Sequence, residues 1–507
     1  MTNHLFHGLM QKGLAAPERP FAVLPDGAVT SYGDLDARSA RFAAVLKEAG
    51  VVPGDRVAVQ VDKSIEALEL YLATVRAGAA FLPLNTGYTP AEIDYFLTDA
   101  TPRVFVCDPK AEATLAPIAE KAGAVLMTLG KAGSSGEAAG TLRARAEAAD
   151  ADFEPVDRGP DDLAAILYTS GTTGRSKGAM LSHANLLSNA QVLRETWAFT
   201  EDDVLLHALP IFHTHGLFVA TNTTLVAGGS LIFLAKFDLD TVFAELPKAT
   251  SMMGVPTFYT RMLTDDRLNR EATAHMRLFT SGSAPLLADT HVAFEQRTGQ
   301  RILERYGMTE TNMNTSNPYD GERRAGTVGF PLEGTELRIV GKEDGKSVAD
   351  GEIGVIEVRG PNVFQGYWNM PEKTAAEFRE DGFFITGDLG MIDADGYVVI
   401  VGRDKDLVIS GGYNVYPKEI EQIIDELPGV VESAVIGVPH PDFGEGVVGV
   451  VVAKEKLEEA AILAPLHDQL AKYKQPKRIL FVDELPRNTM GKVQKNLLRD
   501  AYSDLFS

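Results

Sequence analysis

A loop rich in glycine, hydroxyl and cationic side chains follows the apolar run 163–168, which predicts a strand. The residues in it that could bind an anion are Thr169, Ser170, Gly171, Thr172, Thr173, Gly174 and Lys177. Glycines let backbone N–H groups approach a phosphate, hydroxyls donate hydrogen bonds to its oxygens, and the lysine adds positive charge. Lys177 is followed by Gly178 rather than by Ser or Thr, so this is not a Walker loop. A loop of this composition between a strand and a helical run predicts a phosphate site rather than a flexible surface loop.

Three histidines, His207, His213 and His215, lie close together in the sequence. His213 and His215 would share one face of a strand, which would make half of a zinc site. No third ligand follows at a suggestive spacing, so the pattern does not favour a metal. A histidine-metal hydrolase therefore stays only as an alternative, which metal content would test.

Five short motifs follow one another along most of the chain. They are TSGTTGRSKGA from Thr169, YGMTET from Tyr306, TGD from Thr386, GRDKD from Gly402 and PRNTMGK from Pro486. Together they resemble the signature of the adenylate-forming superfamily, which includes acyl-CoA synthetases, peptide-synthetase adenylation domains and firefly luciferase. One such motif would be weak support, but five in this order are specific.

The resemblance implies that ATP activates a carboxylic acid as an acyl-adenylate. Two anions must meet in that reaction, so positive charge and alignment matter more than a protein nucleophile. Lys492 would be the mobile ammonium that bridges the carboxylate and the α-phosphate. Glu310 would bind Mg²⁺, which prefers one or two carboxylates together with phosphates. Asp388 would accept the ribose hydroxyls, and Arg403 would add a ribose or phosphate contact.

Further nucleotide contacts follow from the resemblance alone. Thr309 is expected on a phosphate, and the segment Ser281, Gly282, Ser283 resembles the adenine-side loop of the family, although by itself it reads as a turn. The remaining residues expected beside the nucleotide are Tyr306, Gly307 and Met308. Without the resemblance, Lys492 would read as a solvated lysine and Glu310 as a helix cap.

The superfamily also implies a second half-reaction, in which CoA takes the acyl group. The small C-terminal domain rotates between the two steps, and Lys405 occupies the hinge position. One orientation brings in Lys492, and the other would present Gly411 and Gly412, whose small size lets a pantetheine arm pass close to the backbone.

The acyl pocket is expected at Pro210-Ile211-Phe212-His213, which matches a Pro-x-aromatic-His segment of the family. Arg261, if it points inward, would carry an unpaired charge unless the substrate brings its own anion. Arginine clamps carboxylates well, so this favours a small dicarboxylate. The motifs HTHGL, GVPTFYTR, SGSAPL and YGMTETNMNTS together resemble those of malonyl-CoA synthetases. This resemblance implies that His213 contacts a carboxylate and that Thr214 and Met313 line the wall around the central carbon of malonate. The alternative is that Arg261 pairs with an acidic neighbour on a surface helix.

The elements that must position these residues alternate between strands and helices. Residues 55–61 read as a strand, 64–77 as a helix and 80–84 as a strand, which predicts an α/β fold with largely parallel sheets. Residues 131–157 read as an exposed excursion. From 330 to 400, turns at Asp344-Gly345 and Asp395-Gly396 predict β-hairpins. We expect a large N-terminal domain of layered α/β subdomains with a small β-barrel-like part over 1–402, and a small mobile α+β domain over 403–507.

Composition excludes several classes of function. The formal net charge of -22 disfavours nucleic acid, which needs a basic surface. No apolar stretch is long enough to span a bilayer, and the N-terminus does not read as a signal peptide. The lone Cys107 lies in an apolar run and is expected in a buried strand, so a reducing cytoplasm fits. Nothing in the sequence predicts an oligomeric state.

The leading hypothesis is the conversion of ATP, malonate and CoA to malonyl-CoA, AMP and diphosphate, with methylmalonate as a further substrate to test. Another acyl-CoA synthetase, or an adenylation enzyme that charges a carrier protein, is the nearest alternative. Few residues follow Lys492, so a fused carrier is not expected. A non-catalytic nucleotide-binding regulator is the alternative from another class.

Overall fold

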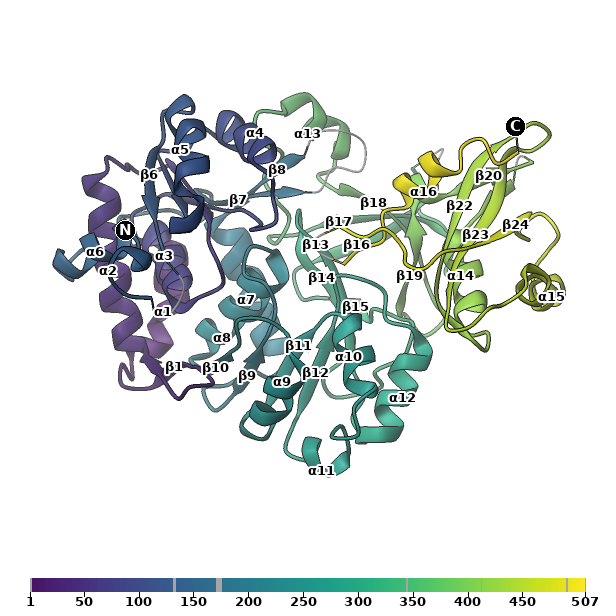
Figure 1. Cartoon of the computed structure of the whole chain (residues 1–507), viewed down its shortest axis with the longest axis horizontal. Coiled ribbons are helices and arrows are strands. Elements are labelled where there is room, and N and C mark those ends of the chain that lie inside the picture. The colour runs from purple at the N-terminus through teal and green to yellow at the C-terminus, as the bar shows by residue number, and fades with distance from the viewer. Residues whose placement is uncertain are drawn as a thin grey trace.

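The computed structural model describes residues 2–130, 134–169, 176–342, 345–411, 413–488 and 491–506 of the 507-residue chain. The two termini lie at opposite ends of the longest axis, and the C-terminal part forms a separate lobe (Figure 1). The strands that are described form four sheets, two mainly parallel and two mainly antiparallel. The predicted α/β class is therefore confirmed.

The first parallel sheet contains the strands predicted from the apolar runs. Its order is β6 (Val125–Thr128), β5 (Val104–Cys107), β3 (Arg56–Gln60), β4 (Ala80–Pro83), β7 (Leu163–Thr169) and β8 (Lys177–Ser182). The connection between β3 and β4 is the predicted helix α3 (Ile65–Arg76), whose first turn is capped by Ser64. Cys107 is fully buried in β5, as predicted, and burial raises the pKa of its thiol to about 12.

One local prediction is wrong. The segment after the phosphate loop is not helical at first, because β8 pairs antiparallel with β7 before α7 (His183–Thr196) begins. Ala179 and Leu181 of β8 are fully buried, so sheet pairing and burial decide the conformation here.

The second parallel sheet carries most of the candidate site. Its order is β15 (Phe330–Pro331), β14 (Asn312–Ser316), β13 (Leu303–Met308), β12 (Leu278–Ser281), β11 (Ser251–Gly254), β9 (Val204–His207), β10 (Ser230–Phe233), β1 (Pro20–Val23) and β2 (Val29–Ser31). The main core packs the two parallel sheets together through helices between them, where Tyr71 of α3 meets Phe81 at 5.2 Å and Phe218 at 5.9 Å between ring centroids.

The remaining helices of this part cover the two sheets. They are α1 (His4–Leu14), α2 (Tyr32–Glu48), α4 (Pro90–Ala100), α5 (Glu112–Lys121), α6 (Thr141–Ala148), α8 (Asn222–Ala227), α9 (Leu239–Glu245), α10 (Pro256–Leu263), α11 (Arg270–Thr273) and α12 (Ala288–Thr298). The expected excursion over 131–157 contains α6, and residues 131–133 lie outside the described part. A π-helix over His215–Thr221 precedes α8.

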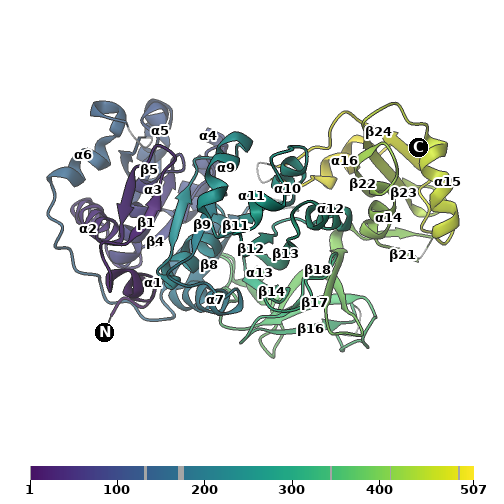
Figure 2. The same ribbon diagram turned by 90° about the horizontal axis from the view of Figure 1, so that it is seen from below.

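The hairpin region forms an antiparallel sheet of β16 (Glu336–Val340), β17 (Gly354–Arg359), β18 (Phe384–Ile392) and β19 (Val398–Arg403), with α13 (Pro371–Glu377) between β17 and β18. The predicted turn at Asp395-Gly396 joins β18 to β19, and Gly396 has the positive φ of 88° that favours glycine there. Asp344 of the other predicted turn lies outside the described residues. This sheet lies on one side of the parallel sheets (Figure 2).

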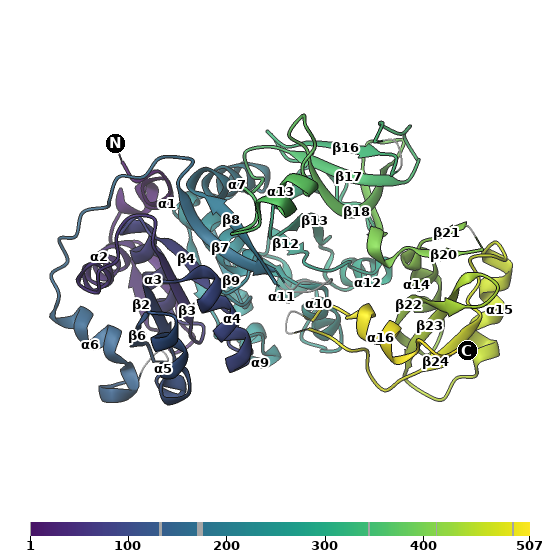
Figure 3. The same cartoon turned by 90° about the horizontal axis from the view of Figure 1, so that it is seen from above.

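The C-terminal lobe has its own sheet and core. The sheet contains β21 (Tyr413–Val415), β20 (Val408–Ser410), β23 (Gly444–Ala453), β22 (Val430–His440) and β24 (Arg478–Phe481). The helices of this lobe are α14 (Pro417–Asp425), α15 (Glu459–Gln469) and α16 (Lys495–Ala501). Residues 404–407 link it to β19, and this link includes a short 3₁₀ turn with Lys405 at its centre. α16 lies nearer to the parallel sheets than β20 and β21 do (Figures 1 and 3).

Candidate active site

The phosphate side of the site begins where β7 ends and β8 starts. Thr169 and Lys177 face each other in the antiparallel register of these strands, and the Thr169 hydroxyl donates to the Lys177 carbonyl at 3.4 Å. The strands therefore fix both ends of the loop. The predicted phosphate contacts between them, Ser170, Gly171, Thr172, Thr173 and Gly174, lie outside the described residues.

Lys177 and Glu310 are connected through Tyr367. The Tyr367 hydroxyl lies 3.0 Å from a Glu310 carboxylate oxygen and 2.6 Å from one of Glu377. The Lys177 ammonium contacts Glu377 at 3.3 Å and lies 4.1 Å from the centre of the Tyr367 ring. Burial raises the pKa of Glu310. A buried carboxylate of this kind fits a divalent cation that also binds phosphates.

A second cluster centres on Asp388 in β18. Tyr306 at the end of β13 donates its hydroxyl to one Asp388 oxygen at 2.5 Å, and the Arg403 guanidinium contacts the other at 2.7 Å. The Asp388 backbone N–H donates a hydrogen bond to the Thr386 hydroxyl oxygen at 3.0 Å. Asp388 raises the pKa of Arg403. This carboxylate is therefore oriented by contacts on both of its oxygens.

Lys492 reaches this same region from the C-terminal lobe. Its side chain keeps access to solvent, yet burial among the surrounding protein and the charge of Arg403 lower the pKa of its ammonium. The charges of Asp388 and Glu310 act on it in the opposite direction. Its backbone N–H donates to the Asn488 side chain at 3.0 Å. One lysine thus lies within electrostatic reach of both clusters.

The predicted acyl segment lies near enough to Lys492 for the charge of this lysine to act on His213. The His215 amide donates to His213 Nδ1 at 3.2 Å, and His215 Nδ1 lies 3.2 Å from the Ser283 hydroxyl. Burial, with the charges of Lys492 and Arg305, lowers the pKa of His213 to about 3, so its imidazole is neutral at ordinary pH. Within the described residues, no three His, Cys, Asp or Glu side chains form a group that could hold a metal ion.

Arg305 is the residue that the sequence patterns missed. It precedes Tyr306 in β13 and is 4% exposed, and its Nε and Nη2 atoms have no hydrogen-bond partner among the described residues. Burial lowers the pKa of its guanidinium to about 9. Gly282 makes room for it, since a Cβ at Gly282 would lie 2.1 Å from Arg305 Nη1. The charge of Arg305 also lowers the pKa of His213 and His215. A buried arginine without a partner is costly unless an anion binds it.

Other residues predicted in the acyl pocket lie in different surroundings. Thr214 and Met313 are buried, and the Thr214 hydroxyl has no partner among the described residues. Met313 in β14 pairs with Gly307 across the β13–β14 ladder. Arg261 is exposed on α10, with its guanidinium 5.0 Å from the centre of the Phe237 ring.

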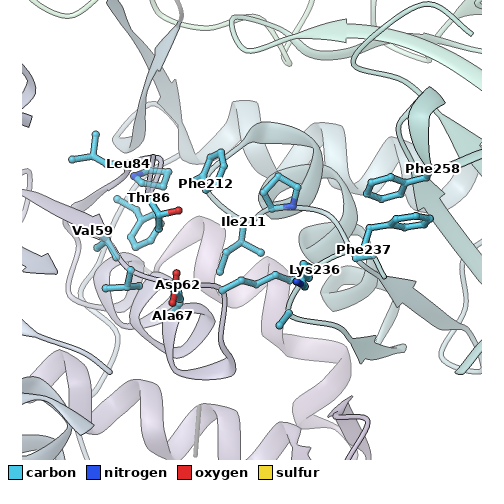
Figure 4. Close-up of a pocket in the computed structure, with 17 residues that line it drawn as sticks. Val59, Asp62, Ala67, Leu84, Thr86, Ile211, Phe212, Lys236, Phe237 and Phe258 are labelled. Atoms are coloured by element: carbon cyan, nitrogen blue, oxygen red, sulfur yellow. The ribbon is translucent and has the colours of Figure 1, made fainter. Parts of the chain in front are cut away.

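A hollow of about 320 Å³ lies beside the acyl segment, between the two parallel sheets. Its wall is mainly apolar and includes Phe212, which neighbours His213, and the stacked rings of Phe237 and Phe258 (Figure 4). Lys63 and Lys236 also line it. Such a space suits a ligand that combines an apolar arm with anionic groups.

The remaining predicted nucleotide and CoA contacts are divided between the two parts of the molecule. Met308 and Thr309 are half-buried next to Glu310, and Ser281 is buried at the end of β12. Gly411 follows β20 directly, in the C-terminal lobe. Gly412 lies outside the described residues. Burial lowers the pKa of Lys405 to about 8.

Comparisons with known proteins agree with the fold. The model of the AMP-binding enzyme family matches residues 11–368, and the model of its C-terminal domain matches 419–492. The ATP-bound structure of MatB from Rhodopseudomonas palustris is 60% identical, with a TM-score of 0.97 and full coverage of both chains. A malonate–CoA ligase of Arabidopsis thaliana is 36% identical over 94% of this chain and 85% of its own length. A feruloyl-CoA synthase of Amycolatopsis is 39% identical over 94% of this chain and 95% of its own length.

None of the described helices combines the length and apolar character that crossing a bilayer requires. The family models together cover both parallel sheets and the larger part of the C-terminal lobe. The chain belongs to the AMP-binding enzyme family.

Proposed function

We propose that this protein is an AMP-forming acid–thiol ligase that converts ATP, malonate and CoA to malonyl-CoA, AMP and diphosphate through a malonyl-adenylate. The observation that carries the malonate assignment is the buried guanidinium of Arg305, which lies against Gly282, has two nitrogens without a partner among the described residues and acts with its charge on His213. The relatedness to a malonate–CoA ligase supports the same substrate.

In the first half-reaction, a malonate oxygen bonds to the α-phosphorus while the bond to the leaving diphosphate breaks. Lys492 is the group in place to neutralise the two anions as they meet, because it lies within reach of both clusters. Since substrate attack needs no proton acceptor on the protein, the neutral His213 serves as a hydrogen-bonding contact for the carboxylate.

We assign nucleotide binding to side chains that neighbouring residues already orient. Asp388 accepts the ribose hydroxyls, with Tyr306 and Arg403 fixing its carboxylate. Glu310 fits Mg²⁺, which supplies positive charge to the phosphates when it is bound. Further contacts are assigned to the loop residues 169–174 with Lys177, to Ser281, Gly282 and Ser283, and to Gly307, Met308 and Thr309.

The distal carboxylate of malonate is assigned to Arg305, whose planar guanidinium can form two parallel hydrogen bonds. Thr214 and Met313 are assigned to the wall around the central carbon, which decides whether methylmalonate fits. Arg261 is exposed in this structure, so we assign it a smaller contribution to substrate choice than Arg305.

In the second half-reaction, the CoA sulfur bonds to the acyl carbon and AMP leaves with the bonding electrons of the cleaved C–O bond. We assign 1–402 and 403–507 as the two domains and Lys405 as the hinge on which the smaller one turns to present Gly411 and Gly412. The hollow lined by Phe212 and Lys236 is a candidate path for pantetheine. A cytoplasmic location, with no nucleic-acid partner, fits the net charge and the reduced Cys107.

The decisive experiment measures diphosphate release and acyl-CoA formation with acetate, malonate, methylmalonate, succinate, ferulate and 4-coumarate. Malonate should give the highest kcat/KM. A preference for acetate or an aromatic acid would contradict the substrate but leave the reaction class intact. AMP formation without transfer to free CoA would favour a carrier-protein partner, and ATP binding without any AMP would favour a regulator.

A further inference from the structure

The phosphate-site lysine already has an anionic partner supplied by the protein. Glu377, the last residue of α13, contacts the Lys177 ammonium at 3.3 Å, although the two residues are 200 positions apart in the sequence. Both side chains are largely shielded, with 22% of Lys177 and 19% of Glu377 exposed. A carboxylate thus holds the cation that the phosphate loop offers to ATP.

Two other groups hold Glu377 in place. The Lys373 ammonium contacts the same oxygen at 2.7 Å, and the Tyr367 hydroxyl lies 2.6 Å from the other oxygen. Burial alone would raise the pKa of Glu377, but Lys373, Tyr367 and Lys177 outweigh it and keep the pKa below its ordinary value. Glu377 is therefore anionic at neutral pH.

This arrangement makes the contact with Lys177 reversible. If the ammonium moves to a phosphate, Glu377 keeps Lys373 and Tyr367, so no uncompensated buried charge is left behind. The Tyr367 ring, 4.1 Å from the ammonium, also remains available to it as an aromatic face. A phosphate and Glu377 can therefore replace each other as the partner of Lys177 with little change in free energy.

We propose that Glu377 is an internal competitor of phosphate for Lys177, which weakens the binding of diphosphate and so assists its release after adenylation. This inference rests on the proposed function, because it assigns Lys177 to the β- and γ-phosphates. The carboxylate needs no contact with the substrate to act, and it is a positioning residue for the lysine rather than a catalytic one.

The test compares inhibition by inorganic diphosphate in wild type, Glu377→Gln and Glu372→Gln. The control removes an equal charge from an exposed position of the same helix. Glu377→Gln should bind diphosphate roughly threefold to tenfold more tightly, as expected for loss of a partly shielded competing ion pair. The KM for ATP should fall in the same direction, and Glu377→Asp should return both values toward wild type.

A purely structural role for Glu377 predicts the opposite sign, with weaker diphosphate binding and a higher KM. That result, or equal inhibition in all variants, would overturn the proposal. Calorimetric titration of each variant with inorganic diphosphate and Mg²⁺ reads the same difference without turnover. The inference can therefore fail while malonyl-CoA is still formed, and it can be tested even if malonate is not the substrate.

Discussion

The nucleotide half and the acyl half of the candidate site differ in how their charged groups are satisfied. On the nucleotide side, Asp388 has Tyr306 and Arg403 on its two oxygens. On the acyl side, Arg305, Thr214 and His215 carry buried polar atoms without partners among the described residues. The first half is preorganised by the protein, whereas the second leaves hydrogen-bonding capacity that only a polar substrate would use. Removing a charged group from the nucleotide half should therefore lower the melting temperature, whereas removing the buried charge from the acyl half should raise it.

The largest effect is expected for Lys492→Ala, which removes the cation shared by both halves. Adenylation should fall by about 10²–10³-fold or more, because a preorganised charge opposite the developing transition state is lost. Transfer from supplied malonyl-AMP to CoA should be largely retained. Diphosphate exchange measures the first half-reaction and thioester formation measures the second. Equal loss in both would contradict a lysine that serves only one orientation of the C-terminal domain.

Arg305→Met tests the acyl half. The kcat/KM for malonate should fall by about 10–100-fold, since a charge-assisted pair of hydrogen bonds is removed. The kcat/KM for short monocarboxylic acids should rise relative to that for malonate. The melting temperature should rise, because a buried unpaired charge is replaced by an apolar side chain of similar length.

Arg261→Met is the matched control for this prediction, since it removes the same charge at an exposed position. A change of less than about threefold in malonate kcat/KM is expected, in line with the small energies of exposed charges. If Arg261→Met shifted the acid preference and Arg305→Met did not, the two assignments would have to be exchanged.

The sequence suggested more residues of the proposed nucleotide half than of the proposed acyl half, and the reason is physical. Asp388, Glu310 and Lys177 lie in glycine-rich or turn motifs whose composition reflects the chemistry of phosphate and ribose. Arg305 lies inside a strand, where its role depends on Gly282 leaving room and on histidines from a distant segment. Neither of these two relations produces a recognisable pattern in the sequence around Arg305.

The fold shows the same division between local and distant information. The strand–helix–strand unit over β3, α3 and β4 was predicted because burial and helical spacing are local properties. The β8 strand was missed because pairing with β7 across the loop decided its conformation. The partnership of Lys177 with Glu377 joins residues 200 positions apart and has no signature in either segment.

Asp388→Asn tests the nucleotide half. The KM for ATP should rise by roughly tenfold. The side chain of asparagine has one oxygen that accepts hydrogen bonds, whereas the carboxylate of Asp388 has two. In contrast to Arg305→Met, the melting temperature should fall, since Arg403 would lose the carboxylate that contacts it at 2.7 Å. Thermal unfolding of both variants under one buffer condition decides the comparison. A fall in both, or a rise in both, would contradict the distinction between a satisfied half and an unsatisfied half.

The smallest expected effect concerns pH and His213. The folded protein takes up a proton on this imidazole only near pH 3, whereas the unfolded chain takes one up near pH 6.5. Between these values the unfolded chain binds more protons, so stability is lost as the pH falls below about 6.5. At pH 5.5 this one group lowers the free energy of unfolding by roughly 1.4 kcal/mol.

The decrease in melting temperature between pH 7.5 and 5.5 should therefore be smaller in His213→Asn than in wild type. The exposed His7→Asn serves as control and should follow wild type. An unchanged pH dependence in His213→Asn would mean that this histidine gains its proton at the same pH in the folded and the unfolded chain, which would contradict the lowering of its pKa by burial.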